Sequence, residues 1–529
     1  FNLRRNWVDF GIRDEAIRRE TYRAVVGVRG DFNDDWNYEL SVNYGEHREK
    51  NVVKGNVNVQ RYLLGIDTTR DAAGNIVCRS KLNPAGTVDY GADAAILAAD
   101  IAACVPINPF GQGSVSQAAR NYVLMDTVAT GKIKQFVASG FVAGDTSAWF
   151  ELPGGPVGFS VGGEYRREKV YYDLDELTQQ GYAFYNAIPT FRAPAFEVKE
   201  LYGEISVPIL KDVPFFKELT ANASGRVSDY KGATGTVYTW GTELTWTPVQ
   251  DIRFRGTYNK AIRAPNVVDL YSEQSQNFAP APNDPCSLRN IGTGSSYREA
   301  NCRAAGVPTN YDFVYTSSIE LISGGNPNLR EETSTSWTVG GVLQPRWIPG
   351  LSLSVDYFNI KVDDVITAPS AQQILNACYD APNLDNPFCG LFTRNGATEG
   401  PSGEAAYQVL QGSLQQTTLN YAKLTAEGIN AELNYRHDFS WGSAGFKTVY
   451  TRMIKRNEYL NPADPSFRNQ ILEELGDPKN QVNFNGDVKF GKLTIGYQMR
   501  WIDKMYLNTY EDYNSVNGLP PQNADYALS

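Results

Sequence analysis

Apolar and polar residues alternate along much of the chain with a period of two, the pattern of a β-strand with two different faces. In 236–247, bulky or apolar side chains occupy one face, namely Tyr238, Trp240, Leu244 and Trp246. The opposite face carries Thr239, Gly241, Glu243 and Thr245. The same alternation recurs in 251–262, 350–362 and 493–501. The chain is therefore predicted to be all-β.

A soluble β-sandwich also alternates, but it turns its apolar face toward a closed core. Three features favour a membrane barrel instead. The polar face carries full charges in mid-strand, as at Arg253 and Arg255, which suits a wet lumen. Aromatic residues gather near strand ends, and the strands are about 10–15 residues long. We therefore expect a transmembrane antiparallel β-barrel.

The connections between these strands alternate in length. Short turns are expected near 30–35, 152–156, 211–217, 248–251, 345–350, 439–444 and 491. Long segments lie between them, at about 49–134, 172–195, 263–331, 363–421, 457–479 and 507–529, whereas one connection of the same parity, 231–235, is short. Tight periplasmic turns and large extracellular loops alternate in this way in outer-membrane barrels. The pattern predicts about 14 strands.

No uninterrupted run of 18 apolar residues is present, so no transmembrane helix is predicted. The most apolar helical stretch, 92–103, is interrupted by Asp93 and Asp100. The formal net charge of −10 argues against a nucleic-acid partner. Tyr (31) outnumbers Phe (24), which suits aromatic rings that keep one end in water.

Six cysteines fall as three successive near neighbours, each pair inside one long segment: Cys78 and Cys104, Cys286 and Cys302, Cys378 and Cys389. None has the spacing of a zinc or redox motif. Proximity favours three local loop disulfides in an oxidising compartment. Free or metal-binding thiols are the alternative.

No constellation of catalytic or metal-binding residues is visible, so neither an enzyme nor a cofactor is expected. His47 and His437 are isolated, and each is interpreted as a solvated or interfacial side chain. The acidic pairs at 363–364 and 473–474 are interpreted as loop or rim charges, although a calcium site at one of them is an alternative. The glycines at 111–113 lack the strand and helix of a phosphate loop.

Two segments border the longest loop of the second half. The first reads Ile262-Arg263-Ala264-Pro265, and the second reads Asn326-Pro327-Asn328-Leu329-Arg330-Glu331-Glu332. They resemble the "F-R-A-P" and "N-P-N-L-K-P-E" signatures of TonB-dependent outer-membrane transporters, with Ile262 in place of Phe and Glu331 in place of Pro. The stretch 425–433 is similar to the "G-x-E" strand of the same family.

This resemblance implies a 22-stranded barrel, an N-terminal plug and a segment that contacts an energy-coupling protein. We therefore expect the chain to be an internal fragment that holds part of the barrel without its plug. The implied partners are outer-membrane lipid and lipopolysaccharide, a TonB-type energy-coupling protein, a small-molecule or oligosaccharide substrate and a surface lipoprotein. The implied location is the bacterial outer membrane.

The residue composition of the loops limits the class of substrate that is expected. Haem is disfavoured, because haem-carrying members hold a histidine between the two motifs and none lies between Pro265 and Asn326. The loops show no basic funnel for an anionic siderophore and are rich in Asn, Gln, Ser and Tyr. An oligosaccharide or a siderophore is expected, with candidate ligand-binding rings at Tyr271, Phe278, Tyr311 and Tyr315. The alternative is that these rings pack the loops themselves.

Two other functions remain open at this point. The barrel could be a passive channel without an energy link, or a surface adhesion or assembly protein whose disulfide-bonded loops are the functional part. The region that precedes the barrel in the whole protein would separate these hypotheses, because only the energised transporter requires a plug and a coupling segment.

Overall fold

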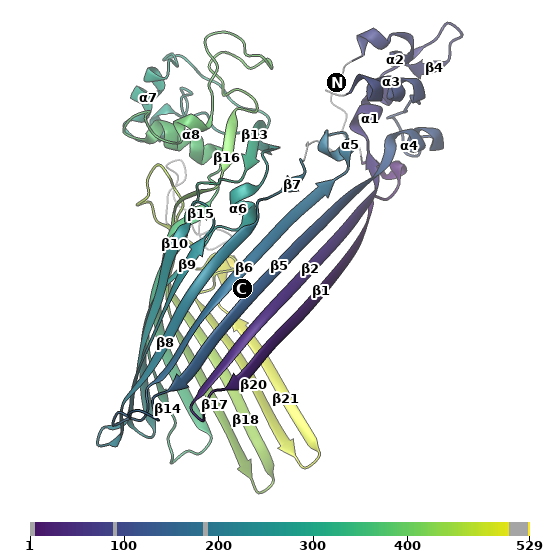
Figure 1. Ribbon diagram of the computed structural model, residues 1–529. Helices are drawn as coiled ribbons and strands as arrows, with labels where there is room; N and C mark the ends of the chain where they lie inside the picture. Colours follow the sequence, from purple (N-terminus) through teal and green to yellow (C-terminus); the bar gives the residue numbers. More distant parts are fainter. Residues whose placement is uncertain (1–5, 88–92, 184–188, 507–526, 529) are drawn as a thin grey trace.

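The computed structural model describes residues 6–87, 93–183, 189–506 and 527–528. Long antiparallel strands form one continuous sheet in which each pairs with its neighbours along the chain (Figure 1). In order, they are β1 (Asp14–Asp31), β2 (Trp36–Val57), β5 (Leu124–Asp145), β6 (Gly158–Leu174), β8 (Phe196–Val213), β9 (Phe216–Tyr230), β10 (Gly235–Val249), β11 (Ile252–Arg263), β14 (Glu332–Leu343), β15 (Leu351–Thr367), β17 (Leu419–Phe439), β18 (Gly442–Tyr459), β20 (Asn480–Phe490) and β21 (Leu493–Ile502).

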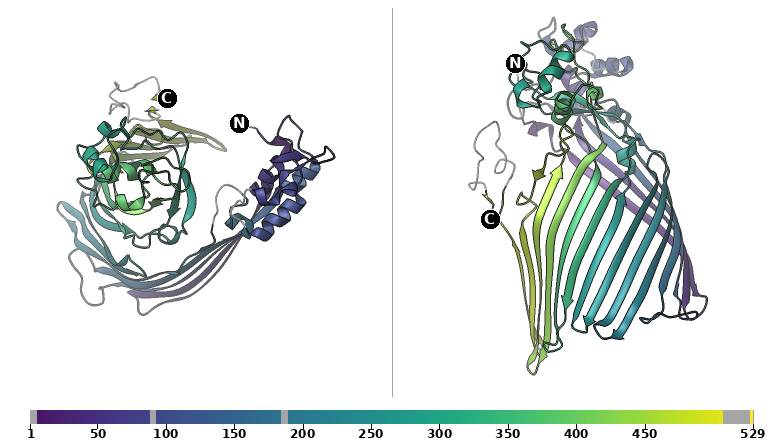
Figure 2. Two further views of the ribbon diagram at one scale, coloured as in Figure 1. Left: turned by 90° about the horizontal axis from the view of Figure 1, so that it is seen from above. Right: turned by 90° about the vertical axis from the view of Figure 1, so that its left-hand side faces the viewer.

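The predicted all-β antiparallel fold is confirmed, and the path from β1 to β21 holds 14 strands. The sheet curves into a wall whose edges are β1 and β21 (Figure 2). Short turns join the strands at one end of this wall, and the long connections gather at the other end (Figure 1). Most of the expected loop at 507–529 lies outside the described residues. None of the described helices is long and apolar enough to cross a bilayer.

Shorter elements belong to the connections or to the margins of the wall. The short strands are β3 (Thr68–Arg70), β4 (Ile76–Cys78), β7 (Phe191–Arg192), β12 (Ser275–Ala279), β13 (Ile319–Gly324), β16 (Leu414–Thr417), β19 (Asn469–Gln470), β22 (Met505–Tyr506) and β23 (Ala527–Leu528). The helices are α1 (Val59–Ile66), α2 (Arg79–Leu82), α3 (Ala94–Ala103), α4 (Gln117–Val123), α5 (Glu176–Gln179), α6 (Val267–Tyr271), α7 (Arg298–Ala304) and α8 (Ala371–Asp380).

The strand register sorts the side chains onto two faces. Leu244, Val339 and Val355 lie on the convex face, where they are 50%, 57% and 43% exposed. The alternate positions point into the hollow of the wall and include Glu243 and the Arg255–Asp356 ion pair, whose Nη2–Oδ2 distance is 2.6 Å. Because a strand has a period of two, one register places these apolar residues outside and these charges inside. This is the inverse of a water-soluble core and matches a wall in lipid.

Aromatic rings mark two levels on the convex face. Near the short turns, rings contact one another in pairs such as Trp441–Phe490, with centroids 4.8 Å apart, and Trp246–Phe254, 5.6 Å apart. Closer to the long connections, a second series of pairs includes Phe136–Tyr165, Trp240–Tyr258 and Trp337–Tyr357. Paired aromatic belts of this kind lie at the two interfaces of a membrane barrel.

Some strands extend further than their sequence pattern indicates. β2 and β5 are 22 residues long and pair up to Val57 and Leu124, whereas the sequence places a loop from about 49 to 134. Beyond Tyr44, the convex face of β2 switches to Glu46, Arg48 and Lys50. The alternation of apolar and polar residues therefore stops while the backbone ladder continues. Pairing between backbones needs no apolar side chain, so the sequence pattern predicts strands that are shorter than those in the structure.

Residues 58–87 and 93–123 form a small helical unit, the N-terminal loop module, at the far end of β2 and β5 (Figure 1). Cys78 and Cys104 form a disulfide inside it. Asp100, which interrupts the apolar stretch of α3, is 2% exposed and accepts hydrogen bonds from Arg61 Nε (2.7 Å) and Gln60 Nε2 (2.8 Å). The acidic residue thus ties α3 to α1 instead of facing solvent.

We predict that one charge has opposite effects at adjacent positions of β15. Val355→Arg places a guanidinium on the convex face and should destabilise the full-length receptor by about 2–4 kcal/mol in lipid vesicles, as measured by reversible unfolding in urea. Ser354→Arg points inward, opposite Glu432, and should change stability little. Equal losses for the two variants would contradict the assignment of the faces.

Candidate functional site

Two long connections, 264–331 and 368–418, fold together into one unit above the wall, the double-loop module. In its sheet, β12 pairs antiparallel with β13, and β13 pairs parallel with β16 of the other connection. Its core mixes buried residues of both connections, with Ile319 and Leu321 packed against Ile374, Leu375 and Leu414. Neither connection can therefore keep this core without the other.

Both connections also carry a disulfide. Cys286 bonds to Cys302 and Cys378 bonds to Cys389, so the three local disulfides expected from the sequence are all present. No free cysteine occurs among the described residues. Cys286, Cys302 and Cys378 lie in a second buried cluster that is again shared by the two connections.

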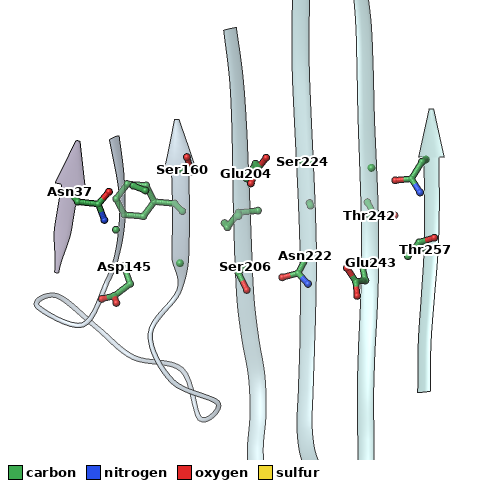
Figure 3. A pocket seen from close by; sticks show the side chains of 18 of the residues that line it. Asn37, Asp145, Ser160, Glu204, Ser206, Asn222, Ser224, Thr242, Glu243 and Thr257 are labelled. Atoms are coloured by element: carbon green, nitrogen blue, oxygen red, sulfur yellow. The ribbon is translucent and has the colours of Figure 1, made fainter. Parts of the chain in front are cut away.

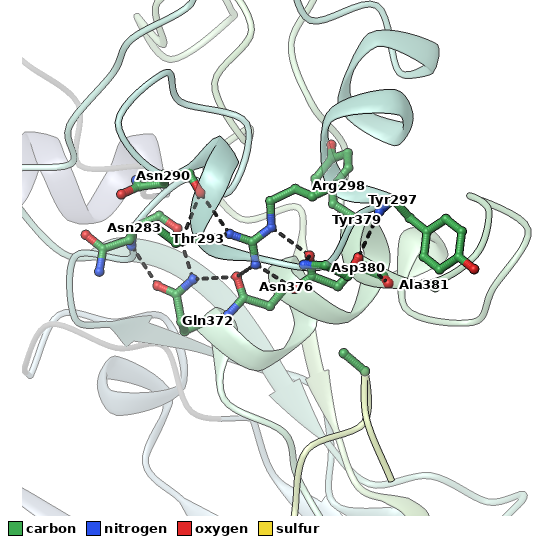
Figure 4. Close-up of polar contacts among 12 residues, drawn as sticks. Asn283, Asn290, Thr293, Tyr297, Arg298, Gln372, Asn376, Tyr379, Asp380 and Ala381 are labelled. Atoms are coloured by element: carbon green, nitrogen blue, oxygen red, sulfur yellow. Dashed lines mark hydrogen bonds and ion pairs between the residues drawn. The ribbon is translucent and has the colours of Figure 1, made fainter. Parts of the chain in front are cut away.

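Two buried ion pairs cross between the connections. Arg394 donates from Nη1 and Nη2 to the two carboxylate oxygens of Asp284 at 2.8 and 2.9 Å, and their side chains are 7% and 0% exposed. Arg298 binds Asp380 through Nε (2.7 Å) and Nη2 (2.5 Å) (Figure 4). Bidentate geometry makes these pairs specific, and the loss of either partner leaves an uncompensated buried charge.

The four candidate rings separate into two groups. Tyr311 and Tyr315 are 8% and 9% exposed, and their hydroxyls are used inside the module: Tyr311 donates to Asp284 (2.9 Å), and Tyr315 accepts from the Val409 N–H (3.0 Å). Burial raises the pKa of Tyr315 to about 12. Both rings are therefore buried within the module, and ligand binding by them stays a prediction. Phe278 is 42% exposed and Tyr271 is half-buried, so both rings are accessible from solvent. Ligand binding by these two rings stays a prediction.

The first family motif connects the end of β11 to the loop. Arg263 pairs across the sheet with Glu332 and donates to it from Nε (2.8 Å) and Nη2 (2.5 Å). Its Nη1 donates to Asp269 (3.2 Å), which closes a capping box with Asn266 at the start of α6. Glu332 also accepts the backbone N–H of Ile366 in β15 (2.8 Å). The pairing of β11 ends at Arg263, two residues before Pro265, which has no N–H to continue it.

The second motif meets the same place from the other side of the loop. Asn326 donates its backbone N–H to Asp269 O (2.8 Å) and its Nδ2 to Thr418 O (3.0 Å). Leu329 is 1% exposed. The preceding Gly325 lies so close to α6 that a Cβ there would approach Leu270 C at 2.7 Å. The two motifs, 60 residues apart in the sequence, thus meet at Asp269, hold both ends of one loop together and contact Thr418, which directly precedes β17.

The inner face of the wall forms a polar hollow of about 690 Å³ near the short turns (Figure 3). Its polar lining comes from successive strands and includes Asn37, Ser160, Glu204, Asn222, Glu243 and Thr257. Carboxylates, amides and hydroxyls here can bind water, a hydrophilic solute or a polar protein surface. Most were not singled out as site residues by the sequence, although their parity along the strands predicts an inward position.

Each of the two isolated histidines contacts neighbouring side chains of the wall. His47 Nδ1 lies 2.9 Å from Thr21 Oγ1, and the ring of His437 stacks with Tyr435 and meets Phe439 edge-on. Of the acidic pairs, Asp363 binds Lys361 at 2.8 Å. Across the described residues, no group of three or more His, Cys, Asp or Glu side chains could hold a metal ion.

Comparison with known proteins identifies the family to which this architecture belongs. The family model described as TonB dependent receptor-like, β-barrel, matches residues 2–528. The chain belongs to this family. A search of curated proteins finds no matching sequence. The resemblance inferred from the two motifs is therefore confirmed at the level of the family.

Solved structures support the fold. The siderophore receptor PirA from Acinetobacter baumannii has 13% sequence identity and a TM-score of 0.51, with 94% of this chain and 52% of that chain covered. A mutant ferric enterobactin receptor (PfeA) from Pseudomonas aeruginosa has 13% identity and a TM-score of 0.51, with 94% and 50% covered. The chain thus spans about half the length of these receptors, and at this identity the similarity concerns the fold alone.

We predict that Asp284→Ala loosens the whole double-loop module but not the wall. The substitution strands the buried Arg394 guanidinium, which should cost the module about 3–5 kcal/mol. Hydrogen exchange of the full-length receptor should then become faster in both β13 and α8, which belong to different connections. The strands should keep their protection. Asp385→Ala removes an exposed carboxylate from the same module and is the control; slow exchange in α8 of the Asp284 variant would contradict the shared core.

Proposed function

We propose that this chain is the wall and the solute-capturing loop region of an energised importer in the bacterial outer membrane. The observation that carries the proposal is how the two family motifs hold the double-loop module: Arg263 of β11 binds Asp269 of the module, and Asn326 binds Asp269 O and Thr418 O directly before β17. A loop module fixed at the end of a wall with a polar inner face is suited to capture a solute outside and pass it inward. The same anchoring is not needed for a passive pore.

The proposed energy source is a TonB-type coupling protein that acts on a plug inside the barrel. The polar inner face offers such a plug a hydrophilic surface, with carboxylates at Glu204 and Glu243. Ligand binding would favour one loop arrangement over another through differential contacts. Force on the plug would then open the path, so no chemistry in the wall is required.

For the substrate, we propose a hydroxyl-rich solute such as an oligosaccharide, with a siderophore as the second candidate. The support is that three arginines of the double-loop module form ion pairs with acidic residues of the same module. Arg298 and Arg394 are buried against Asp380 and Asp284, and Arg289 binds Asp312 at 2.6 Å. Their charges are compensated within the module, which leaves little positive potential for an anionic ligand. Exposed rings and amides suit stacking and hydrogen bonding to hydroxyls.

We expect uptake through the full-length receptor to depend on energy. Bacteria that lack the receptor and bacteria that express it are supplied with radiolabelled oligosaccharides and with ferric siderophores, with and without a protonophore. One class of solute should accumulate only with the receptor and only in energised cells. Receptor-dependent uptake that persists in the presence of the protonophore would contradict the proposal and favour a passive channel.

The same assay tests the loop rings. Tyr271→Ala and Phe278→Ala should each lower the apparent affinity for the transported solute about fivefold to tenfold, because each removes an accessible ring. Tyr297→Ala is the matched control, since it removes a tyrosine of the same connection that is 48% exposed and was not assigned to ligand binding. Equal effects at all three positions would count against a specific role for Tyr271 and Phe278.

A further inference from the structure

The three disulfides differ in how accessible their cysteines are. Five of the six cysteines are at most 3% exposed: Cys78, Cys104, Cys286, Cys302 and Cys378. Cys389 differs from them, because it is half-buried and directly precedes the exposed Gly390. Thiol–disulfide exchange begins when a thiolate reaches a sulfur atom, so access decides which bond reacts and which of its two sulfurs is attacked. The Cys378–Cys389 bond is therefore the one that an external thiol can attack, and Cys389 is the sulfur that it reaches.

The accessible bond also closes the shortest loop. Its cysteines are 11 residues apart, compared with 16 and 26 residues for the other two bonds. In the chain-entropy account, a disulfide stabilises a fold less when its loop is shorter, so this bond contributes the least of the three. The double-loop module keeps its shared core and its buried Arg394–Asp284 pair when the bond is open. Reduction should therefore loosen the module locally without unfolding it.

The same bond fixes the C-terminal end of α8, which contacts α7 of the other connection. It joins the last turn of α8 to the one-turn 3-10 helix Cys389–Leu391. Asn301 of α7 donates its Nδ2 to Tyr379 O (2.9 Å). Arg298 of the same helix binds the carboxylate of Asp380 (Figure 4). Since α7 has a buried disulfide of its own, opening the accessible bond releases only the α8 side of this interface.

The opposite part of α8 holds β12 and the segment that follows it. Ile374 of α8 shares a buried core with Ala279, the last residue of β12. Gln372 forms two hydrogen bonds with the backbone of Asn283, at 2.7 and 2.9 Å (Figure 4). A helix is a rigid element, so a shift at one end of α8 is transmitted through these contacts to β12. β12 carries Phe278, one of the two exposed candidate rings, directly before Ala279.

We propose that Cys389 is a site of thiol–disulfide exchange, through which low-molecular-mass thiols outside the cell lower the affinity of the double-loop module for its solute. A thiolate attacks Cys389 Sγ and forms a mixed disulfide there. The electron pair of the broken S–S bond leaves on Cys378 Sγ, which takes a proton from water. When the external thiol is diluted, the Cys378 thiolate attacks the mixed disulfide, releases the thiol and restores the bond. The effect on the solute rests on the proposed function, whereas the exchange reaction does not.

The test exposes the purified full-length receptor to reduced glutathione, stops the reaction with acid and maps thiols and mixed disulfides by mass spectrometry. Cys378 should appear as a free thiol and Cys389 as the glutathione adduct. This reaction should be about tenfold faster than the opening of either other bond, because rates of exchange follow access. Hydrogen exchange should become faster in α8 and β12, while β14 and β15 keep their protection.

Two variants accompany this measurement. Cys378→Ser/Cys389→Ser should reproduce the hydrogen exchange of the reduced wild type and should not respond to glutathione. Cys78→Ser/Cys104→Ser removes the bond of the N-terminal loop module and is the control, which should keep slow exchange in α8 and the full response to glutathione. In the uptake assay, the first variant and the glutathione-treated wild type should both lose apparent affinity about fivefold, a typical size for coupling between sites.

Equal rates of opening at all three bonds, or a glutathione adduct on Cys378, would overturn the proposed site. Unchanged hydrogen exchange in β12 after reduction would overturn the transmission through α8. An unchanged apparent affinity of the reduced receptor for a solute that it imports would overturn the regulation. Absence of energised uptake would contradict the proposed function alone, because thiol mapping and hydrogen exchange would still decide the inference about Cys389.

Discussion

Backbone hydrogen bonding between neighbouring strands is the constraint on which the rest of this structure depends. A chain in lipid has no water for its N–H and C=O groups, so each must find a partner in the protein. The unbroken antiparallel ladder from β1 to β21 provides these partners. Once the ladder exists, its period of two decides which side chains meet lipid and which line the hollow. Its up-and-down course also sends every long connection to the same end.

That sidedness organises the candidate functional region. Connections that leave the wall at one end can meet, and two of them share a core, a three-stranded sheet and the ion pairs Asp284–Arg394 and Arg298–Asp380. Arg263 joins this module to the wall, because it binds Asp269 of the module as well as Glu332 of β14, and Asn326 links the two connections at Thr418. Capture at a rigid module and passage along a polar inner face are consistent roles for two parts joined in this way.

The sequence predicts the wall well because the wall is a local pattern. Alternation along each strand, turn residues and the position of each cysteine lie within short stretches of chain. The double-loop module could not be predicted in the same way. Asp284 and Arg394 are 110 residues apart, and each looks like an ordinary loop charge until the fold brings them together.

The ends of the strands show a second limit. Above the aromatic belt, the outward residues of β2 and β5 are charged, so the periodic signal ends although the ladder continues to Val57 and Leu124. The family motifs were visible in the sequence, but their purpose was not, because Glu332 and Asp269 complete the Arg263 contacts from different elements. Of the candidate rings, burial separates Tyr311 and Tyr315 from the exposed pair, and burial depends on the whole module.

The most direct test of this account is the sidedness of the wall in living cells. An epitope is inserted in the full-length receptor either between Pro401 and Ser402, in the double-loop module, or between Ser440 and Trp441, in the short turn after β17. Antibody should label the first insertion on intact bacteria and the second only after the outer membrane is made permeable. Labelling of the turn on intact cells, with the loop insertion protected, would contradict the account.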